Sequence, residues 1–169
     1  YKVSSTDWTW AVKFADYDLD GWEDVYFTNG ISRHMNDSDL KITHDMLSGK
    51  HMFDFFKEGE MRREKNRVYQ NSHGQKFIET SDEWGLGHVS VSYGSAWGDL
   101  DGDGDADLVT VNLEEPISIY RNDAQNPNRI AISLQGKGDN TQGLNATVRL
   151  KTSRGSQMRH LSPVSGYLS

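Results

Sequence analysis

The stretch DYDLDGWED at residues 16–24 recurs, with the same spacing of acidic residues, as DLDGDGDAD at residues 99–107. Both follow the pattern Asp-x-Asp-x-Asp-Gly-x-x-Asp, which crowds carboxylates into nine residues. Carboxylates this close repel one another unless a positive charge lies among them. A solvated acidic turn is the alternative, but two copies with one spacing and matching flanks make chance a poor explanation. The pattern therefore predicts a cation-binding loop in each copy.

The residue types indicate which cation these loops suit. Positions 1, 3, 5 and 9 supply carboxylates, the Gly at position 6 permits a sharp turn, and position 7 offers its backbone carbonyl. A flexible, all-oxygen set is typical of Ca²⁺, whereas Mg²⁺ prefers few protein ligands and retains its waters. The predicted Ca²⁺ ligands are Asp16, Asp18, Asp20, the Trp22 carbonyl and Asp24 in the first loop, and Asp99, Asp101, Asp103, the Asp105 carbonyl and Asp107 in the second.

An EF-hand is the obvious alternative for such loops, and the sequence argues against it. An EF-hand needs a bidentate Glu at position 12, where this chain has Phe27 and Thr110. An EF-hand also needs helical flanks, whereas residues 25–29 and 108–112 are rich in β-branched and aromatic residues. We therefore expect each loop to be a turn between two β-strands.

The flanks extend the similarity into an internal repeat whose two loops begin 83 residues apart. Further strands are predicted at 66–71, 76–80 and 117–122. Residues 31–65 interrupt the pattern: an acidic helix start, apolar residues at roughly helical spacing and a charged stretch from Glu58 to Lys65 predict two short helices. After residue 128, alternating segments at 129–134, 146–151 and 157–161 predict a second β module.

Composition narrows the classes of partner. The chain has 169 residues, a formal net charge of −7 and no cysteine. An acidic chain lacks the basic face that nucleic acids require, so no nucleic-acid partner is expected. No apolar run is long enough to span a membrane. The absence of cysteine suits an exported protein. Because the chain starts and stops in mid-pattern, we expect it to be a fragment of a longer one.

The repeats resemble the FG-GAP/VCBS repeats of β-propellers, including the calcium loops of integrin α-subunits. The combination with the C-terminal segment is similar to proteins that carry an ASPIC/UnbV domain. One departure is Asn145, which stands where the ASPIC/UnbV pattern usually has Gly. The segments that carry the resemblance are FADYDLDGWEDVYFTNG (14–30), NRVYQNSHGQKFIETSDEWGL (66–86), YGSAWGDLDGDGDADLVTVNLEEPISIYRND (93–123), NRIAISLQGKGDNTQGLNATVRL (128–150) and GSQMRHLSPVSGYLS (155–169).

The resemblance implies a mainly β fold: part of a β-propeller, with a helical insertion and the start of a β-rich C-terminal module. The expected divisions are a first repeat at 1–30, the insertion at 31–65, a second repeat region at 66–128 and the N-terminal part of an ASPIC/UnbV domain at 129–169. Two repeats cannot close a propeller, so the resemblance implies further blades.

For function, the Ca²⁺ loops and the resemblance favour a non-catalytic binding or adhesion protein of the extracellular space or cell envelope. Its ligand would be a carbohydrate or a surface protein. The alternative is the propeller of an enzyme, or of an enzyme-accessory protein, that acts on polysaccharide. No Gly-x-Ser-x-Gly elbow and no His-Glu-x-x-His motif is present, so we expect no catalytic site.

Overall fold

The computed structural model describes Val3, residues 5–32, Thr43, His51 and residues 61–126, 129–153 and 155–164. The described residues are mainly β, and none of them lies in a helix. No described segment could therefore cross a membrane as an apolar helix. The strands are β1 (Thr9–Ala15), β2 (Asp24–Asn29), β3 (Glu64–Lys65), β4 (Arg67–Ser72), β5 (Lys76–Glu79), β6 (Val89–Ser90), β7 (Ser92–Gly98), β8 (Asp107–Asn112), β9 (Ser118–Tyr120), β10 (Thr147–Thr152) and β11 (Gly155–His160).

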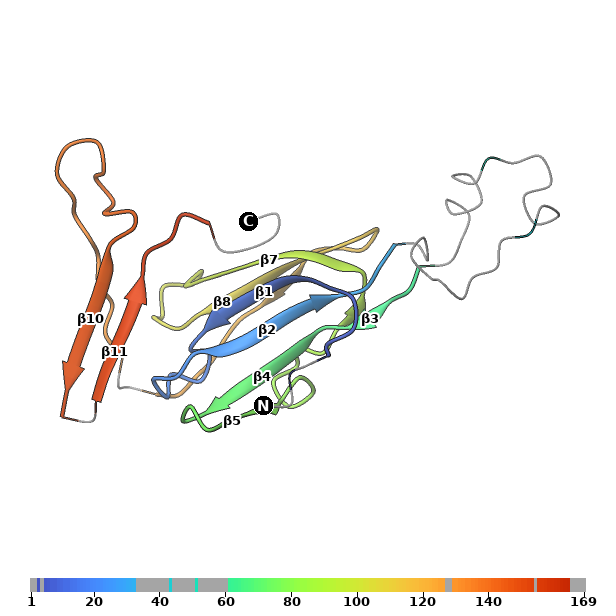
Figure 1. The fold of residues 1–169 in the computed structure, drawn as a ribbon, viewed down its shortest axis with the longest axis horizontal. Helices are drawn as coiled ribbons and strands as arrows, with labels where there is room; N and C mark the ends of the chain where they lie inside the picture. Colours follow the sequence, from blue (N-terminus) through green and yellow to red (C-terminus); the bar gives the residue numbers. More distant parts are fainter. Residues whose placement is uncertain are drawn as a thin grey trace.

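Two antiparallel sheets form the body of the molecule. One has the strand order β1-β2-β4-β5 and the other β7-β8-β9, so both sheets keep their strands in chain order, with β3 of another ladder between β2 and β4 in the sequence. The sheets pack against each other mainly through β1, β2 and β7 (Figure 1). The short β3–β6 pair adds a further ladder, and the β10–β11 hairpin extends from one end of the body (Figure 1).

The hairpins around the two acidic loops are equivalent. The bounds of β7 and β8 are those of β1 and β2 moved by 83 residues, and the strand pairing moves with them. Ala15 pairs with Asp24 as Gly98 pairs with Asp107, and each hairpin has an irregularity near the start of its first strand. The strand–acidic turn–strand prediction is therefore confirmed in both places.

The hydrophobic core lies between the two sheets. Tyr26, on β2, is fully buried and packs in a cluster with Val68 and Leu108. The Tyr26 hydroxyl lies 3.2 Å from Thr110 Oγ1 of β8, and Thr28 Oγ1 donates a 2.8 Å hydrogen bond to the Tyr93 carbonyl. Burying an aromatic side chain of this kind stabilises a fold by about 1.5–3 kcal/mol. Apolar packing and polar contacts together thus fix one sheet upon the other.

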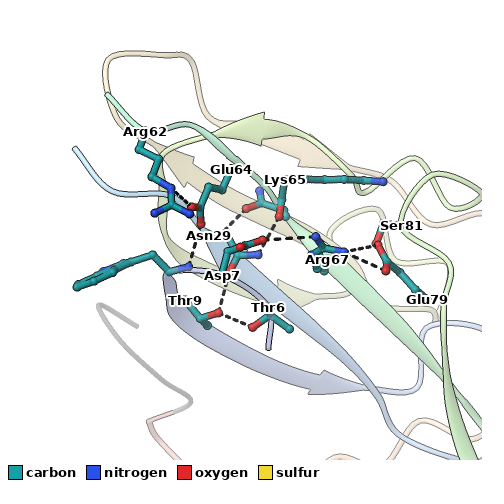
Figure 2. A network of polar contacts seen from close by, with 12 residues as sticks. Thr6, Asp7, Thr9, Asn29, Arg62, Glu64, Lys65, Arg67, Glu79 and Ser81 are labelled. Atoms are coloured by element: carbon teal, nitrogen blue, oxygen red, sulfur yellow. Dashed lines mark hydrogen bonds and ion pairs between the residues drawn. The ribbon is translucent and has the colours of Figure 1, made fainter. Parts of the chain in front are cut away.

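A polar network closes the sheets at the end away from the acidic loops. The Thr9 hydroxyl donates to Asn29 Oδ1 over 2.7 Å, and Asn29 Nδ2 donates to the Lys65 carbonyl over 2.8 Å (Figure 2). At the equivalent place in the second hairpin, Ser92 Oγ donates to Asn112 Oδ1 over 2.8 Å. Because Asn29 and Asn112 are buried, these bonds satisfy polar groups that would otherwise be costly to bury.

The predicted helices at 31–65 fall largely on residues outside the described part of the chain. At the end of this segment the prediction is wrong: Arg62 forms an antiparallel bridge with Ile31, and Glu64 begins β3. The Glu64 carboxylate accepts the Trp8 amide over 2.8 Å and lies 2.5 Å from Arg62 Nε (Figure 2). These tertiary contacts override a helical propensity that is only a weak preference.

The C-terminal module is only partly as predicted. The segments expected at 146–151 and 157–161 correspond to β10 and β11, which pair as a hairpin. The strand expected at 129–134 is wrong: these residues pair with no strand among those described. Ile130 and Ile132 are exposed, so these apolar side chains are not buried against the part of the chain that the structure describes.

Candidate metal centre

The two acidic loops lie at the same end of the two sheets, where β1 leads into β2 and β7 into β8. The last Asp of each loop is also the first residue of the following strand, and it is buried: Asp24 is 0% exposed and Asp107 is 2% exposed. The aspartates at positions 1, 3 and 5 of each loop are nearer the solvent. Each loop therefore has a fixed, buried base and an open mouth.

Three carboxylates converge in each loop. One oxygen from each of Asp16, Asp18 and Asp24 lies within 4.8 Å of the others, and so do oxygens from the equivalent Asp99, Asp101 and Asp107. These are positions 1, 3 and 9 of the pattern in both loops. Each group could hold a metal ion.

Backbone amides hold the loops in one conformation. Asp16 Oδ2 accepts the Gly21 amide over 2.9 Å, and Asp99 Oδ2 accepts the Gly104 amide over 3.1 Å. The position-3 carboxylates, Asp18 and Asp101, accept the amides of the position-5 residues over 3.2 and 3.3 Å. Both glycines have positive φ, +100° and +93°, which accounts for Gly at position 6.

Asn71 and Asn122 support the buried carboxylate of each loop, and the sequence analysis did not identify them. Asp24 accepts the Asn71 amide over 2.8 Å on Oδ1 and the Tyr17 amide over 3.0 Å on Oδ2. Asp107 accepts the Asn122 and Leu100 amides over 2.8 and 2.7 Å in the same way.

The side chains of the two asparagines complete this equivalence. Asn71 Nδ2 donates to the Glu23 carbonyl over 3.0 Å, and Asn122 Nδ2 donates to the Ala106 carbonyl over 3.3 Å. The available signal was the Asn that ends both NRVYQN (66–71) and ISIYRN (117–122). The matched bonds show that the two loops have equivalent supporting hydrogen bonds as well as equivalent carboxylates.

The position-5 aspartates, Asp20 and Asp103, are not in the two convergent groups of carboxylates. They accept the amides of Trp22 and Asp105 over 2.8 and 3.2 Å. The role of the position-7 carbonyls as ligands stays a prediction. The Asp105 carboxylate is buried, and its Oδ2 accepts the Ala124 amide over 3.1 Å, so it ties the second loop to the segment after β9.

The electrostatics of the first loop favour a bound cation. Burial, joined by the charges of neighbouring loop carboxylates, raises the pKa of Asp24 to about 7 and that of Asp16 to about 6. Asp16 Oδ1 is buried and accepts no hydrogen bond within the described structure. An ionised, buried and unpaired carboxylate oxygen is costly, and a cation removes that cost. The residues present therefore fit a hard divalent cation.

The buried carboxylate of the second loop is better compensated. The hydrogen bond from the Asn122 amide, joined by that from Leu100, lowers the pKa of Asp107 below its usual range. The protein therefore stabilises this carboxylate in its ionised form. The two loops thus share a geometry but differ in how strongly the protein itself stabilises their charges.

Comparison of the chain with models of protein families, with curated proteins and with solved structures gives no match. The FG-GAP/VCBS and ASPIC/UnbV resemblance therefore stays a prediction from the sequence.

Proposed function

We propose that each acidic loop binds one Ca²⁺ and that the chain belongs to a non-catalytic, calcium-dependent binding protein. The observation that carries the proposal is the duplicated loop. Asp16, Asp18 and Asp24 recur as Asp99, Asp101 and Asp107, with the same convergence and the same backbone hydrogen bonds. A chance acidic turn gives no reason for two such copies.

The choice of Ca²⁺ over other cations follows from the donor set. The side-chain donors in both groups are carboxylate oxygens, which are hard ligands, and no His or Cys takes part. The orphaned Asp16 Oδ1 supports a cation that takes many oxygen ligands. Asp20 and Asp103, with the carbonyls of Trp22 and Asp105, are the further ligands that such a cation would recruit by a local shift of each loop.

The proposed role of Ca²⁺ is to stabilise the loops rather than to switch the fold. Each loop joins two strands of one sheet, and no pair of helices flanks it that could open as in a sensor EF-hand. A cation bound there neutralises the carboxylates at the end of both sheets. Calcium would therefore favour the folded hairpins over any frayed form.

We further propose that the two sheets are blades of a β-propeller, and the way they stack supports this. The face of the second sheet that meets Tyr26 carries Leu108 and Thr110. The equivalent positions in the first sheet, 83 residues earlier, are Val25 and Phe27. These residues alternate with Tyr26 along β2, so they lie on the face of the first sheet opposite to that of Tyr26. The stacking is therefore head-to-tail, as in successive blades.

Head-to-tail stacking leaves one face of each sheet without a partner sheet among the described residues, and apolar side chains are exposed on both. Phe14 of the first sheet is 53% exposed, and Ile119 of the second is 63% exposed. The open face of the first sheet corresponds to the covered face of the second, and the open face of the second corresponds to the covered face of the first. Further blades on both sides would cover them, which agrees with the propeller implied by the resemblance.

The proposed location is the extracellular space or cell envelope. Ca²⁺ modules that work there bind with dissociation constants of about 10⁻⁴–10⁻³ M, which millimolar calcium saturates. The proposed ligand is a carbohydrate or a surface protein.

Thermal or denaturant unfolding with calcium tests the proposal. At 10 mM Ca²⁺ and a dissociation constant of about 10⁻⁴ M, each site would add about 2.7 kcal/mol to the free energy of unfolding. The Asp16→Asn, Asp99→Asn double variant is the matched control and should lose most of this gain. Equal stabilisation of the wild type and the double variant by Ca²⁺ would contradict the proposal.

A further inference from the structure

The C-terminal hairpin places an arginine beside the first acidic loop. Arg159, on β11, has Nη2 3.9 Å from Asp16 Oδ2 and Nε 3.4 Å from Glu23 Oε1. Gln157 lies two residues earlier and therefore on the same face of β11. Its Nε2 is so close to Gly21 that a Cβ added to that glycine would lie only 2.5 Å from it. One face of β11 is thus packed against the first loop.

We propose that Arg159 is an internal counter-charge that competes with the bound cation at the first loop. This inference rests on the proposed Ca²⁺ site and adds a residue that sets its affinity. Asp16 is shared by both interactions: its Oδ2 is near the guanidinium, while its Oδ1 is buried and accepts no hydrogen bond. A divalent cation among Asp16, Asp18 and Asp24 would lie close to Arg159 and be repelled by it.

The same competition links the hairpin to the loop. When a cation neutralises the loop, the attraction between Arg159 and the loop carboxylates is reduced. By thermodynamic linkage, the factor by which Arg159 weakens cation binding equals the factor by which the cation weakens that docking contact. The β10–β11 hairpin is therefore held more tightly to the first loop in the calcium-free protein than in the calcium-bound protein.

The opposite face of the hairpin supplies the matched control. Val148 and Leu150 of β10 pair with Arg159 and Gln157 of β11, so these residues share one face. Arg149 pairs with Met158 and lies on the other face, with an exposed side chain. Its replacement removes the same charge from the same hairpin without removing a contact to the loop.

The test is a charge series at residue 159, with Ca²⁺ titrated calorimetrically into the full chain. The second loop is silenced by Asp99→Asn and Asp101→Asn, so that only the first loop reports. At low salt we expect Arg159→Gln to tighten Ca²⁺ binding about two- to fivefold, as for an exposed ion pair. Arg159→Glu should tighten it further, Arg159→Lys should stay near the wild type, and 0.5 M KCl should shrink the differences.

Two further measurements separate competition from a structural role. With the first loop silenced instead, by Asp16→Asn and Asp18→Asn, Ca²⁺ affinity at the second loop should not depend on residue 159. Amide hydrogen exchange in residues 155–160 should be slower in EDTA than in calcium for the wild type, and this difference should shrink in Arg159→Gln. A merely structural arginine predicts weaker binding in all three variants at position 159.

The outcomes distinguish this inference from the calcium proposal. If the wild type binds Ca²⁺ but Arg159→Gln and Arg159→Glu bind it no more tightly, the competition is overturned and the calcium site stands. An increase of the same size in Arg149→Gln would also overturn the competition, because net charge alone would then explain it. If the wild type binds no Ca²⁺, both proposals fall.

Discussion

The backbone amide of Asn71 donates a 2.8 Å hydrogen bond to the Asp24 carboxylate, although the two residues are 47 positions apart in the chain. Asn122 holds Asp107 with the same 2.8 Å bond. The base of each acidic loop is thus fixed by a later part of its own sheet: β4 in the first sheet and the residues just after β9 in the second. The loops are therefore parts of the sheets rather than independent acidic turns.

The first prediction concerns the side chain of Asn71. In Asn71→Ala, the hydrogen bonds to the Glu23 carbonyl and from the Gly74 amide are lost. Two half-buried bonds of this kind are worth about 1–3 kcal/mol of unfolding free energy. Chemical denaturation measures the loss. Gln75→Ala, in the same turn with an exposed side chain, should change stability by less than about 0.5 kcal/mol, and an equal loss there would contradict the assignment.

The second prediction concerns Gly74, whose φ is +72° and beside which the Trp22 ring packs. A Cβ at this position would lie 2.6 Å from Trp22 Cζ3, so the ring must move. Gly85 has φ of +70° with nothing within 4 Å of its added Cβ. Both Ala variants carry a backbone strain of about 1 kcal/mol, but Gly74→Ala should cost more by the Trp22 clash. Equal unfolding free energies would show that the ring is not packed there.

The third prediction tests the contact between the sheets. Tyr26→Phe removes the hydroxyl that lies 3.2 Å from Thr110 Oγ1 in the core and should destabilise the protein by about 1 kcal/mol. A double-mutant cycle with Thr110→Val should give a coupling energy of about 0.5–1.5 kcal/mol. Additive effects of the two substitutions would contradict a direct interaction across the sheets.

The fourth prediction is a pH dependence that calcium reverses. Burial holds the pKa values of Asp16 and Asp24 at about 6 and about 7, above the ordinary 3.8. Between about pH 4 and pH 7 the folded state therefore binds more protons than the unfolded state. Without metal, stability should fall as pH rises through this window.

In saturating calcium the same window should show the opposite trend, because the cation binds only ionised carboxylates. Urea unfolding at pH 5, 6 and 7.5, with EDTA or with Ca²⁺, measures both trends. Asp16→Asn should reduce the slope in EDTA. A metal-free protein that becomes more stable from pH 5 to pH 7.5 would contradict the role given to Asp16 and Asp24.

The features that could be predicted from the sequence were those determined by residues close together in the chain. The acidic pattern and its β-branched and aromatic flanks are contiguous in the chain, so the strand–turn–strand unit followed from local sequence. The role of Asn71 depends on strand pairing between β2 and β4 across a long insertion, and spacing carries no such information. Position 5 was predicted as a ligand from the pattern, and this stays a prediction: Asp20 Oδ1 accepts the Trp22 amide within the loop.

The errors have the same origin. Glu64 lies in a charged, helix-favouring stretch, but the Trp8 amide and Arg62 hold it in an extended segment. Residues 129–134 alternate as a strand should, yet a strand forms only where a partner edge is available. Local propensity was overruled in the first case by contacts from distant residues. In the second case the pattern had no neighbour to pair with among the described residues.

Isothermal titration of the whole chain with CaCl₂ is the most direct test of the paired calcium sites. We expect two Ca²⁺ per chain with dissociation constants of about 10⁻⁴–10⁻³ M, one after Asp16→Asn or Asp99→Asn, and none after both. Mg²⁺ at the same concentration should bind more weakly. If a folded wild-type chain takes up no Ca²⁺ at millimolar concentration, the acidic loops are not calcium sites.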